Sequence, residues 1–402
     1  MSQPSAVTTA GQYRQTYADV MMGSYARPLA VLERGEGCHV WDVDGKRYLD
    51  FLGGIAVNSL GYAHPVLVAA VSHQVATLSH VSNYFATRPQ IDLAARLQQI
   101  TGAGDAGRVY FGNSGAEAME AAFKLARLND GGGKRTRIIS LTNSFHGRTM
   151  GSLALTGKPA LQVPFGPMPG GVEHIDGTIE DLEAAIDDTV AALIFEPIKG
   201  EAGVVDLPDG FIQRARELTS QHGALLIIDE IQTGIARTGA WFAYQKYGIL
   251  PDAVAMAKGL GGGVPIGALV TFGRASELYK AGHHGSTFGG NPLVTAAALA
   301  VLDEIERSDL IGNSEVRGRQ LSDGIRALGS PLITEVRGQG LLIGIGLADP
   351  IAKQLSAAAL ERGLIINAAN ESSIRLAPPL IIGDDEVAEF LELFTATLEA
   401  AA

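Results

Sequence analysis

The chain reads Gly223-Ala224-Leu225-Leu226-Ile227-Ile228-Asp229-Glu230-Ile231-Gln232-Thr233-Gly234 across residues 223–234, and this segment indicates the architecture most clearly. Five apolar residues followed directly by an acid predict a strand buried on both faces, with Asp229 at its carboxyl end. Ligands of open α/β sheets bind at that end. Asp229 is alternatively a metal ligand or a helix N-cap, and a strand ending in Asp-Glu also occurs in P-loop NTPases. The chain contains no Gly-x-x-x-x-Gly-Lys-Ser/Thr, and residues 131–135 lack its first glycine and its hydroxyl residue.

A lysine follows a second apolar run. Val254-Ala255-Met256-Ala257 predicts a short buried strand, and Lys258 stands between that strand and a glycine-rich turn. An ammonium group in this position loses solvent, which lowers its pKa toward that of a usable amine. Such an amine can form a Schiff base with a carbonyl substrate or with pyridoxal phosphate. The alternative is a lysine whose stem packs on apolar surface while its head reaches water.

Pyridoxal phosphate would account for both residues. Its ring nitrogen must stay protonated for the ring to withdraw electrons, and an ion pair with Asp229 would keep that proton in place. Gln232, in the loop that follows, is a candidate hydrogen-bond partner for the phenolic oxygen of the ring. The sequence therefore has to supply an anion site for the phosphate group as well.

Residues 109–127 have the order strand, turn and helix that binds a phosphate. Val109-Tyr110-Phe111 predicts the strand, and Ala118 to Arg127 is a strong helix former. Between them, small residues let an anion approach the backbone N–H groups and the helix dipole. Ser114 also predicts an N-cap, with Glu117 completing a capping box. A second glycine-rich turn, residues 285–292, is either another anion site or an ordinary loop.

The pattern along the chain indicates an α/β fold. Helical and strand patterns alternate from about residue 60 to 290, which predicts a mostly parallel sheet covered by helices on both faces. A β-hairpin is expected over residues 38–50, with its turn at Asp44-Gly45, and the first ~20 residues are expected to be mobile. Further helices are predicted at 90–100, 179–186, 210–222, 292–307 and 384–398, and further strands at 137–141, 191–196, 268–271, 341–347 and 364–367.

Composition narrows the class of protein. With 402 residues, 46% of them hydrophobic, the chain can bury a large core in two domains. Its net charge of −12 argues against nucleic acid and anionic membrane surfaces as partners. A single cysteine, Cys38, fits a reducing compartment such as the cytoplasm. No apolar run approaches the ~20 residues of a membrane span, and residues 1–17 are too polar for a secretion signal. No metal site is expected, because the adjacent pair His283-His284 cannot converge on one ion.

Seven stretches within residues 53–292 have the order and spacing typical of one enzyme family: Gly53–Asn58, His80–Asn83, Asn113–Ala118, Ser144–Thr149, Glu196–Glu201, Asp229–Gly234 and Gly285–Pro292. From about Tyr25 to Ile382 the chain resembles the class III, fold-type I aminotransferases, which use pyridoxal 5'-phosphate. The resemblance implies a large domain, residues 61–290, with a mostly parallel seven-stranded sheet. It also implies a smaller α+β domain formed by residues 1–60 and 291–402.

The resemblance assigns roles to residues. Lys258 resembles the catalytic lysine that carries the cofactor and shuttles the proton, and Asp229 resembles the partner of the ring nitrogen. Other residues implied at the cofactor are the phosphate cradle and its neighbours, the ring-stacking aromatic and the loop after Asp229: Ser114, Gly115, Ala116, Phe145, Glu230, Ile231, Gln232 and Thr287.

Substrate-binding roles are also implied, for Arg148, Glu201, Ser286 and Arg375. Arg148 resembles the clamp on the substrate carboxylate, a role suited to the rigid fork of a guanidinium. Glu201 resembles an acid that neutralises Arg375 in one half-reaction and releases it in the other. In the family, the residues matching Ser286 and Thr287 come from the neighbouring subunit, which implies a homodimer. The alternatives are a surface salt bridge for Arg148 and core packing for Phe145.

The activity implied is transfer of the terminal amino group of N2-acetylornithine to 2-oxoglutarate, which gives glutamate. The same residues would serve other ω-amino acids, such as ornithine, 4-aminobutyrate or succinylornithine. A catalytically silent binding protein on the same fold is a further alternative, although the set of lysine, aspartate and glycine residues is complete. Lys199 and Ala202 depart from the glutamine and glycine common in the family, and both lie beside Glu201 in the sequence.

Overall fold

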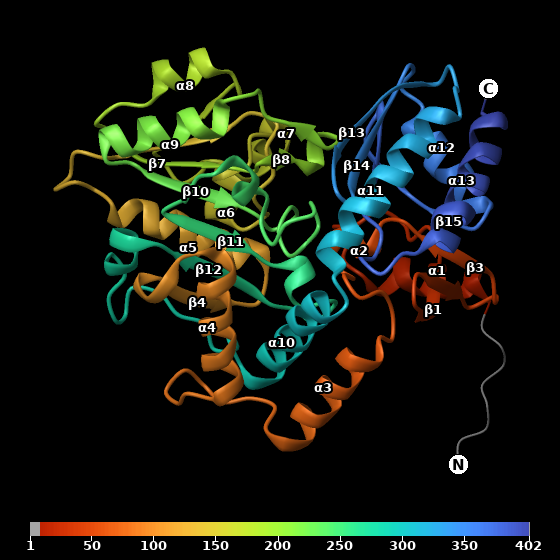
Figure 1. Ribbon diagram of the computed structural model, residues 1–402, viewed down its shortest axis with the longest axis horizontal. Coiled ribbons are helices and arrows are strands. Elements are labelled where there is room, and N and C mark those ends of the chain that lie inside the picture. Colours follow the sequence, from red (N-terminus) through yellow and green to blue (C-terminus); the bar gives the residue numbers. More distant parts are fainter. Residues whose placement is uncertain (1–8, 402) are drawn as a thin grey trace.

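The computed structural model describes residues 9–401, and its largest unit is a seven-stranded sheet (Figure 1). The strand order is β4-β12-β11-β10-β7-β5-β6. Only β12 runs against its neighbours, so the other strands all end at the same edge. This confirms the predicted mostly parallel seven-stranded sheet. The bounds are β4 (Arg108–Gly112), β5 (Arg137–Leu141), β6 (Val172–Ile175), β7 (Val190–Phe195), β10 (Leu225–Asp229), β11 (Ala253–Met256) and β12 (Gly267–Thr271).

Helices cover both faces of this sheet. Consecutive side chains of a strand point to opposite faces, and β10 shows the consequence. Leu225 and Ile227 pack in a core shared with α5 (Gly115–Leu128), whereas Leu226 and Ile228 pack in a core shared with α9 (Phe211–His222). All four side chains are fully buried, which is why this strand reads as an unbroken apolar run.

Segments near the two ends of the chain form two smaller four-stranded sheets, and only the first combines strands from both ends (Figure 1). One has the order β1-β2-β3-β15 and contains the predicted hairpin around Asp44-Gly45; the other has the order β13-β14-β17-β16. The single strand predicted at 364–367 is wrong, because the chain changes sheets at Ile366. The bounds are β1 (Leu32–Glu36), β2 (His39–Asp42), β3 (Arg47–Asp50), β13 (Ile333–Gln339), β14 (Leu342–Leu347), β15 (Leu364–Ile365), β16 (Asn367–Asn370) and β17 (Ser373–Leu376).

Helix α10 (Pro292–Arg307) has the bounds that the sequence predicts and packs on α3, α4 and α11. The remaining helices are α1 (Ala10–Val20), α2 (Gly53–Ala56), α3 (Pro65–Thr77), α4 (Arg88–Thr101), α6 (Met150–Leu155), α7 (Pro159–Gln162), α8 (Ile179–Ala185), α11 (Leu310–Ala327), α12 (Ala352–Glu361) and α13 (Asp384–Glu399). A short ribbon joins β8 (Ile198–Lys199) to β9 (Val205–Asp206). The division into domains at residues 60 and 290 stays a prediction.

Residues 10–20, which the sequence places in a mobile N-terminus, form the helix α1, and the expectation of mobility stays a prediction. A capping box stabilises the start of this helix: the Gln12 N–H donates to Thr9 Oγ1 over 3.3 Å, and the Thr9 N–H donates to Gln12 Oε1 over 2.8 Å. The same expectation for residues 1–8 lies outside the described residues. Across residues 9–401, no helix is both long and apolar enough to cross a membrane.

Candidate active site

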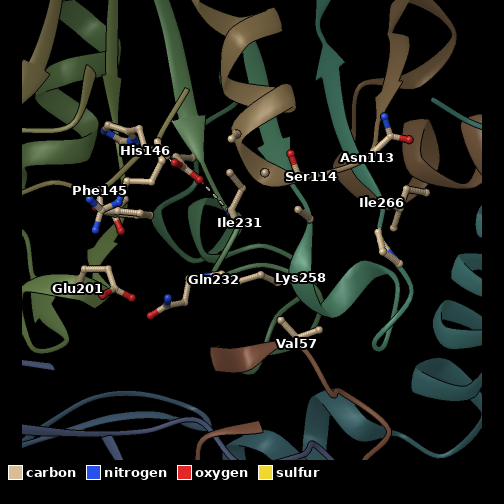
Figure 2. Close-up of a pocket in the computed structure, with 18 of the residues that line it drawn as sticks. Val57, Asn113, Ser114, Phe145, His146, Glu201, Ile231, Gln232, Lys258 and Ile266 are labelled. Carbon is tan, nitrogen blue, oxygen red and sulfur yellow. Dashed lines mark hydrogen bonds and ion pairs between the residues drawn. The ribbon is translucent and has the colours of Figure 1, made fainter. Parts of the chain in front are cut away.

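Five strand ends converge on one cavity of about 440 Å³. The segments that follow β4, β5, β7, β10 and β11 all line it, because these strands run in the same direction and end at one edge of the sheet. Figure 2 shows Ser114 at the start of a helix on one side, Phe145 and His146 on the opposite side, and Lys258 with Gln232 between them. Ten predicted site residues line the cavity: Ser114, Gly115, Ala116, Phe145, Arg148, Glu201, Asp229, Ile231, Gln232 and Lys258.

Lys258 begins a short 3-10 helix directly after β11. Its backbone has φ +43°, a left-handed conformation that is costly for a residue with a Cβ. Loss of solvent and, to a smaller extent, the nearby guanidinium of Arg375 together lower the pKa of its amine from 10.5 to about 8, against the opposing effect of Glu201 and Asp229. The Lys258 side chain is only partly buried, because it lines the cavity. The protein therefore holds an amine that loses its proton more than two pH units below the ordinary value of 10.5.

Asp229 ends β10 and is 3% exposed. Its Oδ1 accepts a hydrogen bond from the Ile231 N–H over 3.0 Å, and its Oδ2 lies 2.7 Å from Nδ1 of the buried His146. These contacts fix the carboxylate at the floor of the cavity. No role was predicted for His146, although it stands between two predicted site residues in the sequence. Its pairing with Asp229 needs the sheet, which brings the ends of β5 and β10 to the same edge.

Glu196 is a second buried acid, for which no role was predicted. It follows β7, beside β10, and its Oε2 accepts a hydrogen bond from the Phe145 N–H over 2.9 Å. Burial raises the pKa of Glu196 to about 7. The nearby His146 opposes this rise, and the Asp229 carboxylate adds to it. The sequence could have predicted Glu196, because it follows an apolar strand directly, and the same pattern identified Asp229.

The start of α5 has the form of an anion site. Ser114 caps the helix by accepting the Glu117 N–H over 3.2 Å. The predicted capping box is wrong in its second bond, because Glu117 Oε2 accepts the Asn113 N–H over 2.7 Å. Gly115 and Ala116 are the first residues of the helix, so their N–H groups have no partner within it. A Cβ on Gly115 would meet Ile231 Cδ1 at 2.9 Å, which accounts for glycine at this position.

An ion pair closes one end of the cavity. Arg375, 2% exposed, donates from Nη1 to Glu201 Oε1 and, over 3.1 Å, to Gln232 Oε1, while its Nη2 donates to Asn367 Oδ1 over 2.8 Å. Burial disfavours the ionised form of Glu201, but the Arg375 guanidinium outweighs this effect and holds the pKa of Glu201 below its usual range. Glu201 lines the cavity and Arg375 lies behind it. The predicted pair is present in its closed form.

Arg148 reaches the cavity from the loop after β5, with its guanidinium carbon 5.7 Å from the centre of the Phe145 ring. It is exposed and forms no ion pair within residues 9–401. Glu120 of α5 holds the segment that follows: its Oε1 accepts the Gly151 N–H over 2.8 Å and the Ser152 N–H over 3.1 Å. The loop that carries Arg148 is thus tied to the helix that forms the anion site.

Three predicted site residues lie elsewhere. The carboxylate of Glu230 turns away from the cavity and accepts hydrogen bonds from the Thr233 hydroxyl and the Tyr244 N–H. Its interpretation as a cofactor contact is therefore not supported by its position. Ser286 and Thr287 line a neighbouring hollow, and Ser286 Oγ accepts a hydrogen bond from Asn113 Nδ2 over 3.1 Å.

An amine of lowered pKa, a buried carboxylate and a helix start that line one cavity define a class of enzyme. The chain belongs to the aminotransferase class-III family, which it matches over residues 21–398. It is 52% identical to the acetylornithine aminotransferase of Mycobacterium tuberculosis over 98% of both chains.

Solved structures of aminotransferases are similar to this chain over nearly its whole length. The acetylornithine aminotransferase of Elizabethkingia anophelis has a TM-score of 0.87 and 35% identity, covering 97% of this chain and 99% of that one. An ornithine aminotransferase of Toxoplasma gondii, described with partial occupancy of PLP at its active site, has a TM-score of 0.92 and 32% identity, covering 98% and 95%.

Proposed function

We propose that this enzyme transfers the terminal amino group of N2-acetyl-L-ornithine to 2-oxoglutarate, forming N-acetyl-L-glutamate 5-semialdehyde and L-glutamate in arginine biosynthesis. One observation carries the proposal: Lys258 and Asp229 face one cavity that also contains the start of α5. The name of the mycobacterial relative, at 52% identity, supports the choice of amino donor.

The residues present fit pyridoxal 5'-phosphate. Lys258 would carry it, Asp229 would pair with its ring nitrogen, and the N–H groups of Gly115 and Ala116 would bind its phosphate. Phe145 would stack on the ring. When bound, the cofactor supplies an aldehyde that accepts the amino group and a ring that withdraws electrons from the reacting carbon.

The environment of each side chain suits its proposed task. A pKa of about 8 would let the Lys258 amine take a proton from the amino-bearing carbon of the substrate and deliver it to the cofactor, which keeps the amino group. The bond between His146 and Asp229 holds the carboxylate in a single orientation. Arg148 would grip the carboxylate that both substrates share with its two-pronged guanidinium.

The pair of Glu201 and Arg375 would separate the two half-reactions. With the pair closed, the cavity wall is the Glu201 carboxylate, whose charge Arg375 neutralises, and this wall suits a substrate without a distal carboxylate. With Glu201 moved aside, Arg375 would bind the distal carboxylate of 2-oxoglutarate.

We further propose a cytoplasmic homodimer in which each subunit supplies Ser286 and Thr287 to its partner's active site. Their position outside their own subunit's cavity supports this arrangement. So do three aromatic side chains in the same region, Tyr84, Phe85 and Phe288, which are 93%, 69% and 59% exposed and would be covered by a second copy.

The test compares amino donors. Purified enzyme is supplied with 2-oxoglutarate and, in turn, acetylornithine, ornithine, 4-aminobutyrate and succinylornithine. We expect the highest kcat/KM with acetylornithine, no turnover without the acceptor, and no turnover of Lys258→Ala. A higher kcat/KM for ornithine, which the similarity to the Toxoplasma enzyme makes the second candidate, would reject the proposed donor but not the chemistry. Activity retained by Lys258→Ala would reject the chemistry.

A further inference from the structure

Asn367 lies directly across the sheet from Arg375. The two residues are cross-strand partners in the antiparallel pair of β16 and β17, and Asn367 Oδ1 accepts a hydrogen bond from Arg375 Nη2 over 2.8 Å. The side chain of Asn367 is only partly buried, whereas Arg375 is 2% exposed. The amide therefore contacts the guanidinium from a fixed position on the sheet, independently of the loop that carries Glu201.

The other contacts of Arg375 show what depends on this bond. Nη1 donates to Glu201 and to Gln232 Oε1, and Nε has no partner within the described residues. If Glu201 moves away, the two amide oxygens of Gln232 and Asn367 are the remaining side-chain acceptors, one on each terminal nitrogen. One hydrogen on Nη1 and one on Nη2 are then available, which is the arrangement that a carboxylate binds with two parallel bonds.

We propose that Asn367 is a positioning residue for the acceptor substrate, which holds the Arg375 guanidinium in place while Glu201 is displaced and thereby presents it to the distal carboxylate of 2-oxoglutarate. This inference rests on the proposed function. An amide suits the role because it is a neutral acceptor: it orients the guanidinium without cancelling the charge that attracts the incoming carboxylate. A carboxylate here would compete with the substrate.

The two half-reactions of the holoenzyme separate this role from a structural one. Stopped-flow absorbance follows the aldehyde form of the cofactor reacting with acetylornithine, and the amino form reacting with 2-oxoglutarate. For Asn367→Ala we expect the second-order rate constant with 2-oxoglutarate to fall about tenfold relative to that with acetylornithine, because a hydrogen bond to a charged group is lost. For Asn367→Asp the relative loss should reach about 100-fold, because the new carboxylate stays paired with Arg375.

One control accompanies these variants. Pyruvate, an acceptor without a distal carboxylate, should react with the Asn367→Ala enzyme and with the wild type at similar rates.

The outcomes are distinct. Equal losses in both half-reactions of Asn367→Ala and Asn367→Asp would overturn the inference and indicate a structural role. So would a normal rate with 2-oxoglutarate in both variants. If the wild type itself does not transfer amino groups from acetylornithine to 2-oxoglutarate, the proposed function fails, and that result is seen before any variant is compared.

Discussion

The partly buried amine of Lys258 should make the cofactor-free protein less stable at neutral pH than a variant with a neutral side chain of similar length. Its pKa is lowered from 10.5 to about 8, and each pKa unit corresponds to ~1.4 kcal/mol. The charged form therefore costs the folded state up to ~3 kcal/mol. Lys258→Met removes this cost but also removes a cation that favours ionised Glu201, so we expect a net gain of ~1–3 kcal/mol at pH 7.

The lowered pKa also predicts how the stability of the wild type changes with pH. Below pH 8 the amine is protonated in both the folded and the unfolded chain, so the full cost is present. Between pH 8 and 10.5 the unfolded chain binds more protons, so the wild type gains stability as pH rises, and above 10.5 the cost is gone. Urea unfolding of both cofactor-free proteins, at one protomer concentration, measures the difference. Equal stabilities at pH 7, or a difference that does not shrink toward high pH, would refute the reasoning.

Three further predictions concern single side chains. Arg148→Gln should lower kcat/KM about 100-fold for both substrates, measured by steady-state kinetics, because a two-pronged carboxylate contact is lost; the visible absorbance of the bound cofactor should be unchanged. Gly115→Ala should raise the dissociation constant for pyridoxal phosphate about tenfold in an absorbance titration, because the new methyl meets Ile231 and displaces the helix start. Glu120→Ala should lower the free energy of unfolding by ~1–2 kcal/mol, measured with urea, because two N–H groups after Arg148 lose their acceptor.

The fold could be predicted from the sequence where the local pattern of apolar residues agrees with their burial in the structure. The run of Leu225 to Ile228 is apolar throughout because both faces of β10 are covered, and its acid marks the edge of the sheet. The change from one sheet to the other at Ile366 could not be predicted from the sequence. Residues 364–367 have the composition of one short strand, and only pairing with β3 on one side and β17 on the other shows that they serve two sheets.

The candidate site also contains residues that the sequence predicts and residues that it does not. Lys258, Asp229 and the start of α5 were predictable because each follows an apolar strand in the order that the chemistry requires. His146 was not, because its partner is 83 residues away and becomes visible only when strand order is known. Glu230 was misplaced because successive residues at the end of a strand point in opposite directions. Asp229 faces the cavity, so its neighbour faces Tyr244.

The parallel pairing of β3 with β15 constrains how the protein is made. Leu49 and Asp50 find their partners, Leu364 and Ile365, only after almost the whole polypeptide has left the ribosome. Until then the first hairpin keeps an open edge, and such an edge invites pairing with other nascent chains. Synthesis that stops before residue 364 should therefore yield fragments that need chaperones, even when the seven-stranded sheet is complete.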